Sequence, residues 1–392
     1  MAIETPDGYE AFTVETIKDY IASDALLAAR VGGAPDQLKT VEVGDGNLNL
    51  VFIVEGPAGS LIIKQALPYV RLIGESWPLP LKRSYFEYHT LTRQAAASSD
   101  GARVPEIYAY DEANTLFRTS DLHMDTAQKK ADVALYSDNV ALCDITESLV
   151  FTEPYQEAEL NQWTSPQLDR LVQALRQDRD VKVAVQVMKE RFTTCTQSLL
   201  HADFHSGSVM VNQAETRVID PEFSFYGPMG FDTGALFANY FLAYFSQAGH
   251  AQQAGDRDAY QKWLLQTAID TWATFEARFR ELWHGERTGI LFPRSLFEDQ
   301  DDAMGSEQAL TRTLRSLFVD TVGFAGTKMI RRLVGLAHVE DMETIEDPDR
   351  RARCEANALA MGRELLVSRH QFSSIGQLCD LARSIKNRGV TL

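Results

Sequence analysis

Residues 40–66 contain three short apolar segments separated by glycine-containing turns, TVEVGDGNLNLVFIVEGPAGSLIIKQA. The first segment ends near Val43, the second spans Leu50–Val54 and the third spans Leu61–Gln65. Turns this short join neighbouring strands as hairpins, whereas parallel strands need a much longer crossover connection. The stretch therefore predicts an antiparallel meander and argues against a crossover unit at this place in the chain.

Helical patterns flank the meander. Apolar residues recur at helical spacing within residues 9–31, and a second helix is predicted for Lys82–Ala97 after a Gly-, Trp- and Pro-rich loop at Gly74–Pro80. Two further short strands are predicted around Glu106–Asp111 and Thr115–Arg118. Together these segments predict a small lobe rich in β-structure.

Helical patterns dominate the rest of the chain from about Leu122, interrupted by a strand, turn and strand region within Leu199–Asp220. The sequence therefore predicts an α+β fold of two lobes, similar in plan to protein kinases. Residues 1–120 form the predicted N-lobe with an antiparallel sheet, and residues 121–392 form the predicted, mainly helical C-lobe.

Composition limits the classes of partner. A formal net charge of -17 disfavours nucleic acid, because phosphate backbones are bound by clustered Lys and Arg. The longest apolar run, Gly234–Phe245, is shorter than the roughly 20 residues that span a bilayer, and it predicts a buried helix. The N-terminus has no signal-peptide pattern, and four scattered cysteines indicate free thiols, so we expect a cytoplasmic location.

The turn between the first two predicted strands consists of Gly44, Asp45, Gly46 and Asn47. Glycines at such a turn let backbone N–H groups approach a polyphosphate closely. Asp-Gly between apolar strands is also a common hairpin signal without any ligand. The turn alone leaves both interpretations open.

Lys64 lies within the apolar strand LIIKQ, where a buried ammonium group needs a partner. It could hold nucleotide phosphates, or it could point to solvent from an edge strand. Glu87, on the following helix, is the expected ion-pair partner of Lys64. A local pair between Glu87 and Arg83, four residues earlier in that helix, is the alternative.

Two motifs with carboxylates follow in the C-terminal part. Asp203, in HADFH, could accept the proton of a substrate hydroxyl, and Asp220 and Glu222, in IDPEF, could chelate a metal that bridges ATP phosphates. The order of glycine turn, strand lysine, helix glutamate and these carboxylates is that of kinase-like phosphotransferases.

Asp232 and a pair of arginines complete the set of candidate residues. Asp232 begins an apolar helix, where we expect it to cap N–H groups or to anchor the loop that carries Asp203. Arg331 and Arg332 could stabilise a phosphoryl group in transit. A solvated helix face is the alternative, because adjacent helical residues point about 100° apart.

Five stretches of the chain resemble the 5-methylthioribose kinase family, which is related to aminoglycoside phosphotransferases and choline kinases. They are VEVGDGNLNLVF (41–52), GESWPLPLKRSYFE (74–87), HADFHSGSVMV (201–211), IDPEFSFYGPMGFDTG (219–234) and KMIRRLVGLAHVEDME (328–343). The resemblance implies ATP- and Mg²⁺-dependent phosphorylation of the anomeric hydroxyl of 5-methylthioribose to the 1-phosphate, in methionine salvage. It also implies a homodimer.

The resemblance gives roles to the motif residues. Asp203 would be the catalytic base, Asp220 and Glu222 would hold Mg²⁺, and Lys64 would contact the ATP phosphates. Ser208 stands where many kinases have a metal-binding asparagine, so Glu222 could supply the missing ligand.

Other residues are placed around the two ligands by the same resemblance. Arg331 and Arg332 would offset charge near the sugar and the transferred phosphate, and the loop bearing Trp77 would lie on the substrate side. Ser120 and Leu122 lie in the predicted hinge beside the adenine, which lacks the expected Glu-Asp pair. Two alternatives remain: a kinase of the same fold for another small alcohol, or a catalytically silent nucleotide-binding protein.

Overall fold

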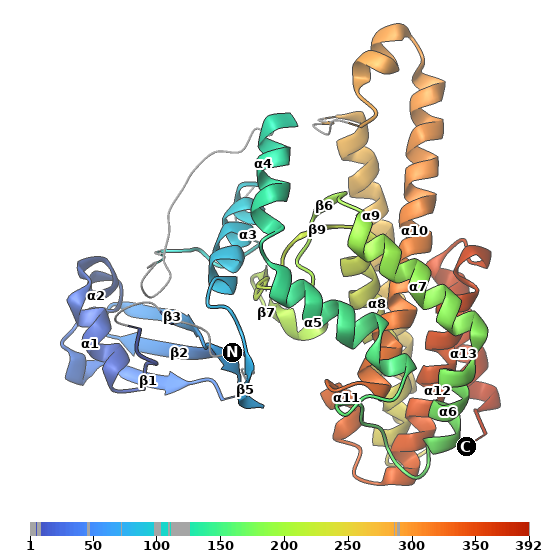
Figure 1. The fold of residues 1–392 in the computed structure, drawn as a ribbon, viewed down its shortest axis with the longest axis horizontal. Helices are drawn as coiled ribbons and strands as arrows, with labels where there is room; N and C mark the ends of the chain where they lie inside the picture. Colours follow the sequence, from blue (N-terminus) through green and yellow to red (C-terminus); the bar gives the residue numbers. More distant parts are fainter. Residues whose placement is uncertain are drawn as a thin grey trace. The chain divides into compact units, whose positions relative to one another are not determined.

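The computed structural model describes residues 5, 9–44, 48–71, 73–97, 103–108, 110, 126–285, 287 and 291–391. Asp45, Gly46, Asn47, Ser120 and Leu122 lie outside these residues, as does the predicted strand at 115–118. The chain divides into two compact units (Figure 1). The first comprises residues 1–122, 139–142 and 210–224, and the second comprises residues 123–138, 143–209 and 225–392.

The sheet of the first unit is the predicted antiparallel meander. Its strands are β1 (Lys39–Glu42), β2 (Asn49–Gly56) and β3 (Gly59–Ala66), in the order β1-β2-β3. Val51 lies opposite Lys64 in the register of β2 and β3. The prediction of three antiparallel strands is confirmed, and it places Lys64 near the end of β3.

Two helices pack with this sheet where a helical pattern was predicted within residues 9–31. They are α1 (Thr16–Ser23) and α2 (Ala25–Val31), and α2 begins where the Asp24 side chain accepts hydrogen bonds from the Leu26 and Leu27 N–H groups. Figure 1 shows both helices beside the sheet. The shared core includes Ile17, Ile21, Leu27, Val31, Phe52, Val54 and Leu61.

Residues 74–80, predicted as a loop, contain a strand. β5 (Gly74–Pro78) pairs antiparallel with β4 (Tyr69–Val70), and Gly74 has a φ of +78°, which favours glycine. The prediction was wrong because Gly and Pro mark turns, although Pro also fits the edge of a two-stranded ribbon. The helix that follows, α3 (Arg83–Ala97), begins one residue later than predicted.

The strand predicted at Glu106–Asp111 is not formed over residues 106–108, and residue 110 forms only a single bridge. Pro105 lacks the N–H group that a ladder needs. Instead, the carbonyl oxygen of Arg103 accepts a hydrogen bond from the N–H group of Val218. This bond ties residue 103 to the segment that carries Asp220.

Residues 210–224 belong to the first unit although they are distant from it in the sequence. They include most of a small hairpin formed by β7 (Val209–Val211) and β8 (Thr216–Val218). The sequence had assigned this segment to the helical lobe. Its position puts Asp220 and Glu222 in the same unit as Lys64 and Glu87.

The second unit is mainly helical. A short ribbon of β6 (Ser198–Leu199) and β9 (Tyr226–Gly227) carries the loop with Asp203 between its strands. Its helices are α4 (Thr126–Tyr136), α5 (Val140–Phe151, in this unit from Cys143), α6 (Asp169–Gln177), α7 (Arg179–Thr194), α8 (Gly230–His250), α9 (Asp258–His284), α10 (Ala303–Val334), α11 (Glu340–Glu343), α12 (Pro348–Val367) and α13 (Ile375–Arg388). Short 3-10 turns occur at Pro35–Gln37, Glu153–Tyr155, Ser206–Ser208, Arg294–Leu296, Glu298–Gln300 and Arg369–Gln371.

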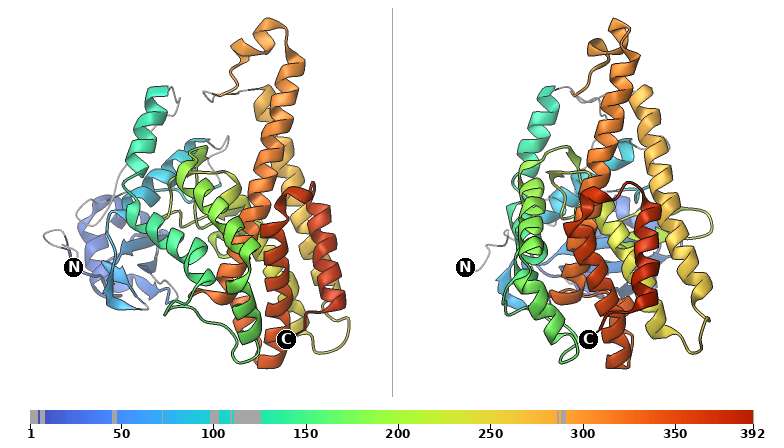
Figure 2. Two further views of the ribbon diagram at one scale, coloured as in Figure 1. Left: turned by 45° about the vertical axis from the view of Figure 1, so that its right-hand side comes forward. Right: turned by 90° about the vertical axis from the view of Figure 1, so that its right-hand side faces the viewer.

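Helices α8, α10 and α12 pack together as the core of the second unit. Most residues of α8 are buried, among them eight of the twelve residues in the run Gly234–Phe245, so the prediction of a buried helix is confirmed. The C-terminal end of α9 lies beside the N-terminal end of α10 (Figure 2). There, Trp283, Leu310 and Leu314 form a small separate core. Within the described part of the chain, no helix is both long and apolar enough to cross a bilayer.

Glycines allow the backbones of these helices to approach closely. A Cβ on Gly234 of α8 would lie 2.7 Å from the Thr321 carbonyl oxygen of α10. A Cβ on Gly326 of α10 would lie 2.6 Å from the carbonyl oxygen of Gly362 in α12. Because the obstructing atoms are backbone, a side chain here would push the helices apart.

We expect Gly326→Ala to lower the free energy of unfolding by about 1–3 kcal/mol, as overpacking does in other cores. The matched control is Gly376→Ala in α13, where the new Cβ would have only the Ser374 hydroxyl at 3.6 Å. Alanine favours helix, so the control should be neutral or slightly stabilising. Urea unfolding of both variants checks this, and equal stability of the two would contradict the close-approach argument.

Candidate active site

Seven of the predicted site residues fall into two clusters, one in each unit. Lys64, Glu87, Asp220 and Glu222 belong to the first unit. The second unit holds Asp203 together with Arg331 and Arg332 of α10.

In the first unit, Lys64 forms ion pairs with two carboxylates. Its Nζ lies 2.8 Å from Glu87 Oε2, and it also donates to Asp220 Oδ1. Burial opposes charge on Lys64, but Asp220 and Glu87 outweigh it and raise its pKa. The predicted pair between Lys64 and Glu87 is therefore present, and the alternative of a solvent-facing lysine is wrong.

Arg83 pairs with Glu222, so the local pair with Glu87 that the sequence left open is not the one formed. The Arg83 Nε lies 3.2 Å from Glu222 Oε2, and both side chains are buried. The Asn49 amide donates to both Glu222 oxygens, at 3.1 and 3.0 Å. Sequence reasoning missed Arg83 as a partner of Glu222, and it missed Asn49 altogether.

Three carboxylates of this cluster could hold a metal ion. One oxygen from each of Glu87, Asp220 and Glu222 lies within 4.8 Å of the others. Burial and the neighbouring carboxylates raise the pKa of Glu87 to about 7, although Lys64 opposes the shift. Carboxylate oxygens gathered in this way suit a hard divalent cation such as Mg²⁺. The donor set therefore fits the expected metal, with Glu87 as a third candidate ligand.

The backbone at Asp220 is unusual. Its φ of +69° lies in the left-handed region, which non-glycine residues seldom occupy. Such conformations cost roughly 1–3 kcal/mol and occur most often at functional sites. The conformation supports a functional role for the Asp220 carboxylate.

In the second unit, Asp232 anchors the loop that carries Asp203. The Asp232 carboxylate accepts hydrogen bonds from the backbone N–H groups of His201 at 2.7 Å and Ala202 at 2.8 Å. Ala202 has a φ of +69°, so these bonds hold a strained turn in place. Asp232 thus anchors the loop, which is one of the two roles that its position in the sequence predicted.

Asp203 is surrounded by basic side chains. Its Oδ1 lies 4.0 Å from Lys328 Nζ and 3.9 Å from Arg332 Nη2, and its Oδ2 lies 3.6 Å from His205 Nε2. Burial would raise the pKa of Asp203, but Lys328, His205 and both arginines lower it well below its usual range. Asp203 is therefore ionised at neutral pH.

The two arginines do not form a solvated helix face. The Arg332 guanidinium lies near Asp203 and donates to the carbonyl oxygens of Ala337 and His338, both at 3.4 Å. Arg331 Nε and Nη1 are buried, and among the described residues they have no hydrogen-bond partner. Burial lowers the pKa of Arg331 to about 9. A buried guanidinium with unused donors is suited to binding an anion.

Lys328 is a third cation that the sequence prediction did not single out. It is buried, and its Nζ lies 4.3 Å above the ring of Phe231. Burial and the adjacent arginines lower its pKa to about 7, against the opposing effect of Asp203. The signal was present in the sequence, because residues 328, 331 and 332 share one face of a helix by their spacing.

Ser208, Gly44 and Trp77 were also singled out in the sequence, and they are not among the charged residues of the two clusters. The Ser208 hydroxyl donates to the backbone oxygen of Asp203 at 3.2 Å, so it supports the loop. A Cβ on Gly44 would meet no atom within 4 Å among those described. Trp77 lies in β5 and is half-buried.

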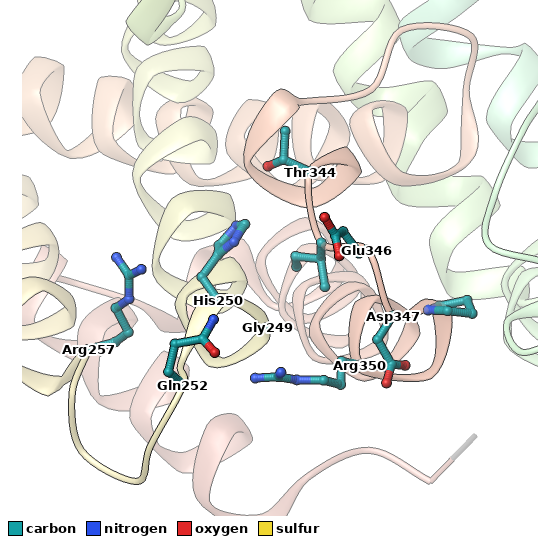
Figure 3. Close-up of a pocket in the computed structure, with 10 residues that line it drawn as sticks. Gly249, His250, Gln252, Arg257, Thr344, Glu346, Asp347 and Arg350 are labelled. Carbon is teal, nitrogen blue, oxygen red and sulfur yellow. The ribbon is translucent and has the colours of Figure 1, made fainter.

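An open pocket at the other end of α8 contains none of these residues. It lies between the end of α8 and the start of α12, and His250, Arg257 and Arg350 are among its lining residues (Figure 3). The His250 ring contacts the Asp341 carbonyl oxygen at 2.8 Å, and Arg350 donates to the carbonyl oxygen of Ala251. Two of its basic side chains, His250 and Arg350, are thus already paired with the backbone.

The burial of the Lys328 ammonium group should lower the free energy of unfolding by an amount that depends on pH. The folded state releases its proton with a pKa of about 7, whereas the ordinary value is 10.5. The unfolded state therefore binds more protons than the folded state between these two pKa values. The loss of unfolding free energy is therefore greatest below about pH 7, and it disappears as the pH rises towards 10.5. We expect Lys328→Met to be more stable than the parent near pH 7, with a gain that shrinks as pH rises.

Denaturant unfolding at about pH 6.5 and about pH 9.5 measures this difference. The control is Lys189→Met, which removes a more exposed lysine of α7 that pairs with Glu147. It should give no gain at either pH. A Lys328→Met protein no more stable than the parent at about pH 6.5 would count against the burial cost.

Comparison with known proteins places the chain in a family. The model of the phosphotransferase enzyme family matches residues 39–277. Methylthioribose kinase 1 of Oryza sativa subsp. japonica is 42% identical over 95% of this chain and 94% of its own length. Methylthioribose kinase of Escherichia coli O45:K1 is 39% identical over 98% and 100%, and that of Yersinia pseudotuberculosis serotype I is 37% identical over 91% and 94%. The chain therefore belongs to the methylthioribose kinases of the phosphotransferase enzyme family.

Proposed function

We propose that this protein transfers the γ-phosphoryl group of ATP to the anomeric hydroxyl of 5-methylthioribose and so forms the 1-phosphate, as a step of methionine salvage. The observation that carries the proposal is the Asp203 carboxylate, which is held in a buried group of cations from α10. This arrangement occurs in a chain whose relatives are named methylthioribose kinases.

Asp203 would orient the sugar hydroxyl and accept its proton. Its lowered pKa keeps the carboxylate ionised, so it can accept a hydrogen bond from the hydroxyl in the ground state. The same low pKa makes it a weak base, so it would accept the proton only as the new P–O bond forms. Positioning would therefore contribute more than basicity, as is usual in phosphoryl transfer.

The cations of α10 would stabilise the phosphoryl group in transit. Arg331 has buried donors that are not used within the described residues, and Arg332 and Lys328 lie about 4 Å from Asp203. Positive charge at fixed positions favours the transition state, because no reorganisation is needed when charge moves.

The cluster of the first unit would hold the nucleotide phosphates. Lys64 would contact the phosphates, with Glu87 holding it in place, and Asp220 and Glu222 would bind Mg²⁺. Bound Mg²⁺ would neutralise charge on the phosphate oxygens. Contacts from the turn at residues 44–47, from Trp77, and from Ser120 and Leu122 stay predictions.

The surroundings of Asp203 also bear on the choice of substrate. Lys328, Arg331 and Arg332 would repel a cationic alcohol such as choline or an aminoglycoside. A neutral sugar with an apolar thioether avoids this repulsion. We also propose a cytoplasmic homodimer, and the four free cysteines agree with a reducing compartment.

A substrate panel tests the proposed function directly. ADP release is measured with purified protein, ATP and Mg²⁺ against 5-methylthioribose, ribose, choline and an aminoglycoside. We expect 5-methylthioribose to give the highest kcat/KM. Higher kcat/KM with choline or an aminoglycoside would favour the other-alcohol kinase, and ATP binding without turnover of any compound would favour a silent nucleotide-binding protein.

Asp203→Asn should reduce kcat by about 100-fold to 10,000-fold while ATP still binds, because the amide cannot accept the hydroxyl proton. Steady-state kinetics and ATP titration measure the two effects separately. Asp256→Asn, at a carboxylate of the loop before α9, is the control and should leave kcat unchanged. Near-normal turnover of Asp203→Asn would remove Asp203 as the base.

A further inference from the structure

We propose that Arg83 is a positioning residue for the Mg²⁺ site. Its guanidinium orients the Glu222 carboxylate and ties it to two backbone segments of the first unit, the start of β2 and the segment before α3. The inference rests on the proposed function, because it takes Glu222 as a metal ligand. It adds a residue for which the sequence offered only a local helix pair.

The contacts of Arg83 join three segments that are far apart in the sequence. Its Nη1 donates to the Pro80 carbonyl oxygen at 2.9 Å, and its Nη2 donates to the carbonyl oxygen of Leu48. Its Nε lies 3.2 Å from Glu222 Oε2. Leu48 is the first described residue after the turn at residues 44–47, and Pro80 lies two residues after the end of β5. One guanidinium therefore holds the start of β2, the segment before α3 and the metal-site carboxylate together.

Burial makes this arrangement sensitive to substitution. Arg83 is 1% exposed and Glu222 is 3% exposed, so neither charge can be solvated by bulk water. A buried carboxylate that loses its cationic partner pays a large desolvation cost. Without the contact to Arg83 Nε, the Asn49 amide would have to orient the Glu222 carboxylate, and the Glu222 oxygens would be less firmly fixed in position for a metal ion.

The geometry requires arginine rather than any cation. The three contacts use Nε, Nη1 and Nη2, which diverge in the plane of the guanidinium. A lysine has a single nitrogen on a flexible stem and cannot contact both carbonyl oxygens and the Glu222 carboxylate from one position. Asn49 adds to the same constraint, because its amide donates to both Glu222 oxygens. Arg83 and Asn49 thus fix the Glu222 carboxylate from two sides.

The test compares ATP binding with and without Mg²⁺ in Arg83→Lys, by isothermal titration calorimetry. We expect the Kd for Mg²⁺·ATP to rise by about 10–100-fold, the usual effect of losing a partner of a metal ligand. The Kd for ATP in EDTA should not change, because Lys64 is untouched. Raising the Mg²⁺ concentration should restore both ATP affinity and ligand-induced thermal stabilisation.

Arg287→Lys is the matched control. Arg287 is similarly buried, with a side chain 6% exposed, and it pairs with Glu298 in the second unit. It should leave both ATP affinities unchanged. Equal Mg²⁺·ATP affinity in Arg83→Lys and in the parent would overturn the inference, and so would an equal loss with and without Mg²⁺. If the parent itself binds ATP independently of Mg²⁺, the proposed metal site fails first.

A double-mutant cycle with Glu222→Gln shows whether Arg83 acts through Glu222. Once the Glu222 charge is gone, Arg83→Lys should cause little further loss of Mg²⁺·ATP affinity, whereas additive losses would contradict the inference. If Arg83→Lys does not fold, Arg83→Gln is compared with the pair Arg83→Gln and Glu222→Gln by circular dichroism. Recovery of the fold in the neutral pair supports the coupling, and its absence overturns it.

Discussion

The close contact between α8 and α10 is the constraint on which the second unit depends. Gly234 leaves no room for a side chain against Thr321, so the two backbones touch. α8 carries Asp232, which fixes the backbone before Asp203, and α10 carries the cations that face Asp203. The helix contact therefore determines the distance between the carboxylate and its cations, and the surrounding helices bury both.

The sequence predicted those parts of the fold that depend on local pattern. Alternating apolar residues and glycine turns predicted β1, β2 and β3. Glu87 was predicted as a partner of Lys64 because a lysine within an apolar strand needs a carboxylate to neutralise it. The sequence offered two roles for Asp232, capping N–H groups or anchoring the loop that carries Asp203, and the structure shows the second. A local rule was sufficient for the strands.

Pairings between distant segments could not be predicted in the same way. Arg83 precedes Glu87 by one helical turn, so a local pair was plausible, but Glu222 enters from a segment more than a hundred residues later. Residues 210–224 contact the rest of the first unit through the Val218 to Arg103 hydrogen bond and through the ion pairs of Asp220 and Glu222, and no periodicity in the sequence predicts these contacts. Lys328 differs, since its spacing from Arg332 already placed the two on one helix face.

Each of the two clusters carries an excess of one sign of charge. In the first unit Lys64 and Arg83 face three carboxylates, whereas in the second unit Lys328, Arg331 and Arg332 lie around Asp203. The first cluster has an excess of negative charge that a divalent cation would offset, and the second has an excess of positive charge that a phosphoryl group would offset. Each excess costs folding free energy in the free protein. Ligands of opposite charge would recover that cost on binding, which is the reason that such unbalanced clusters are tolerated at sites built for Mg²⁺ and phosphate.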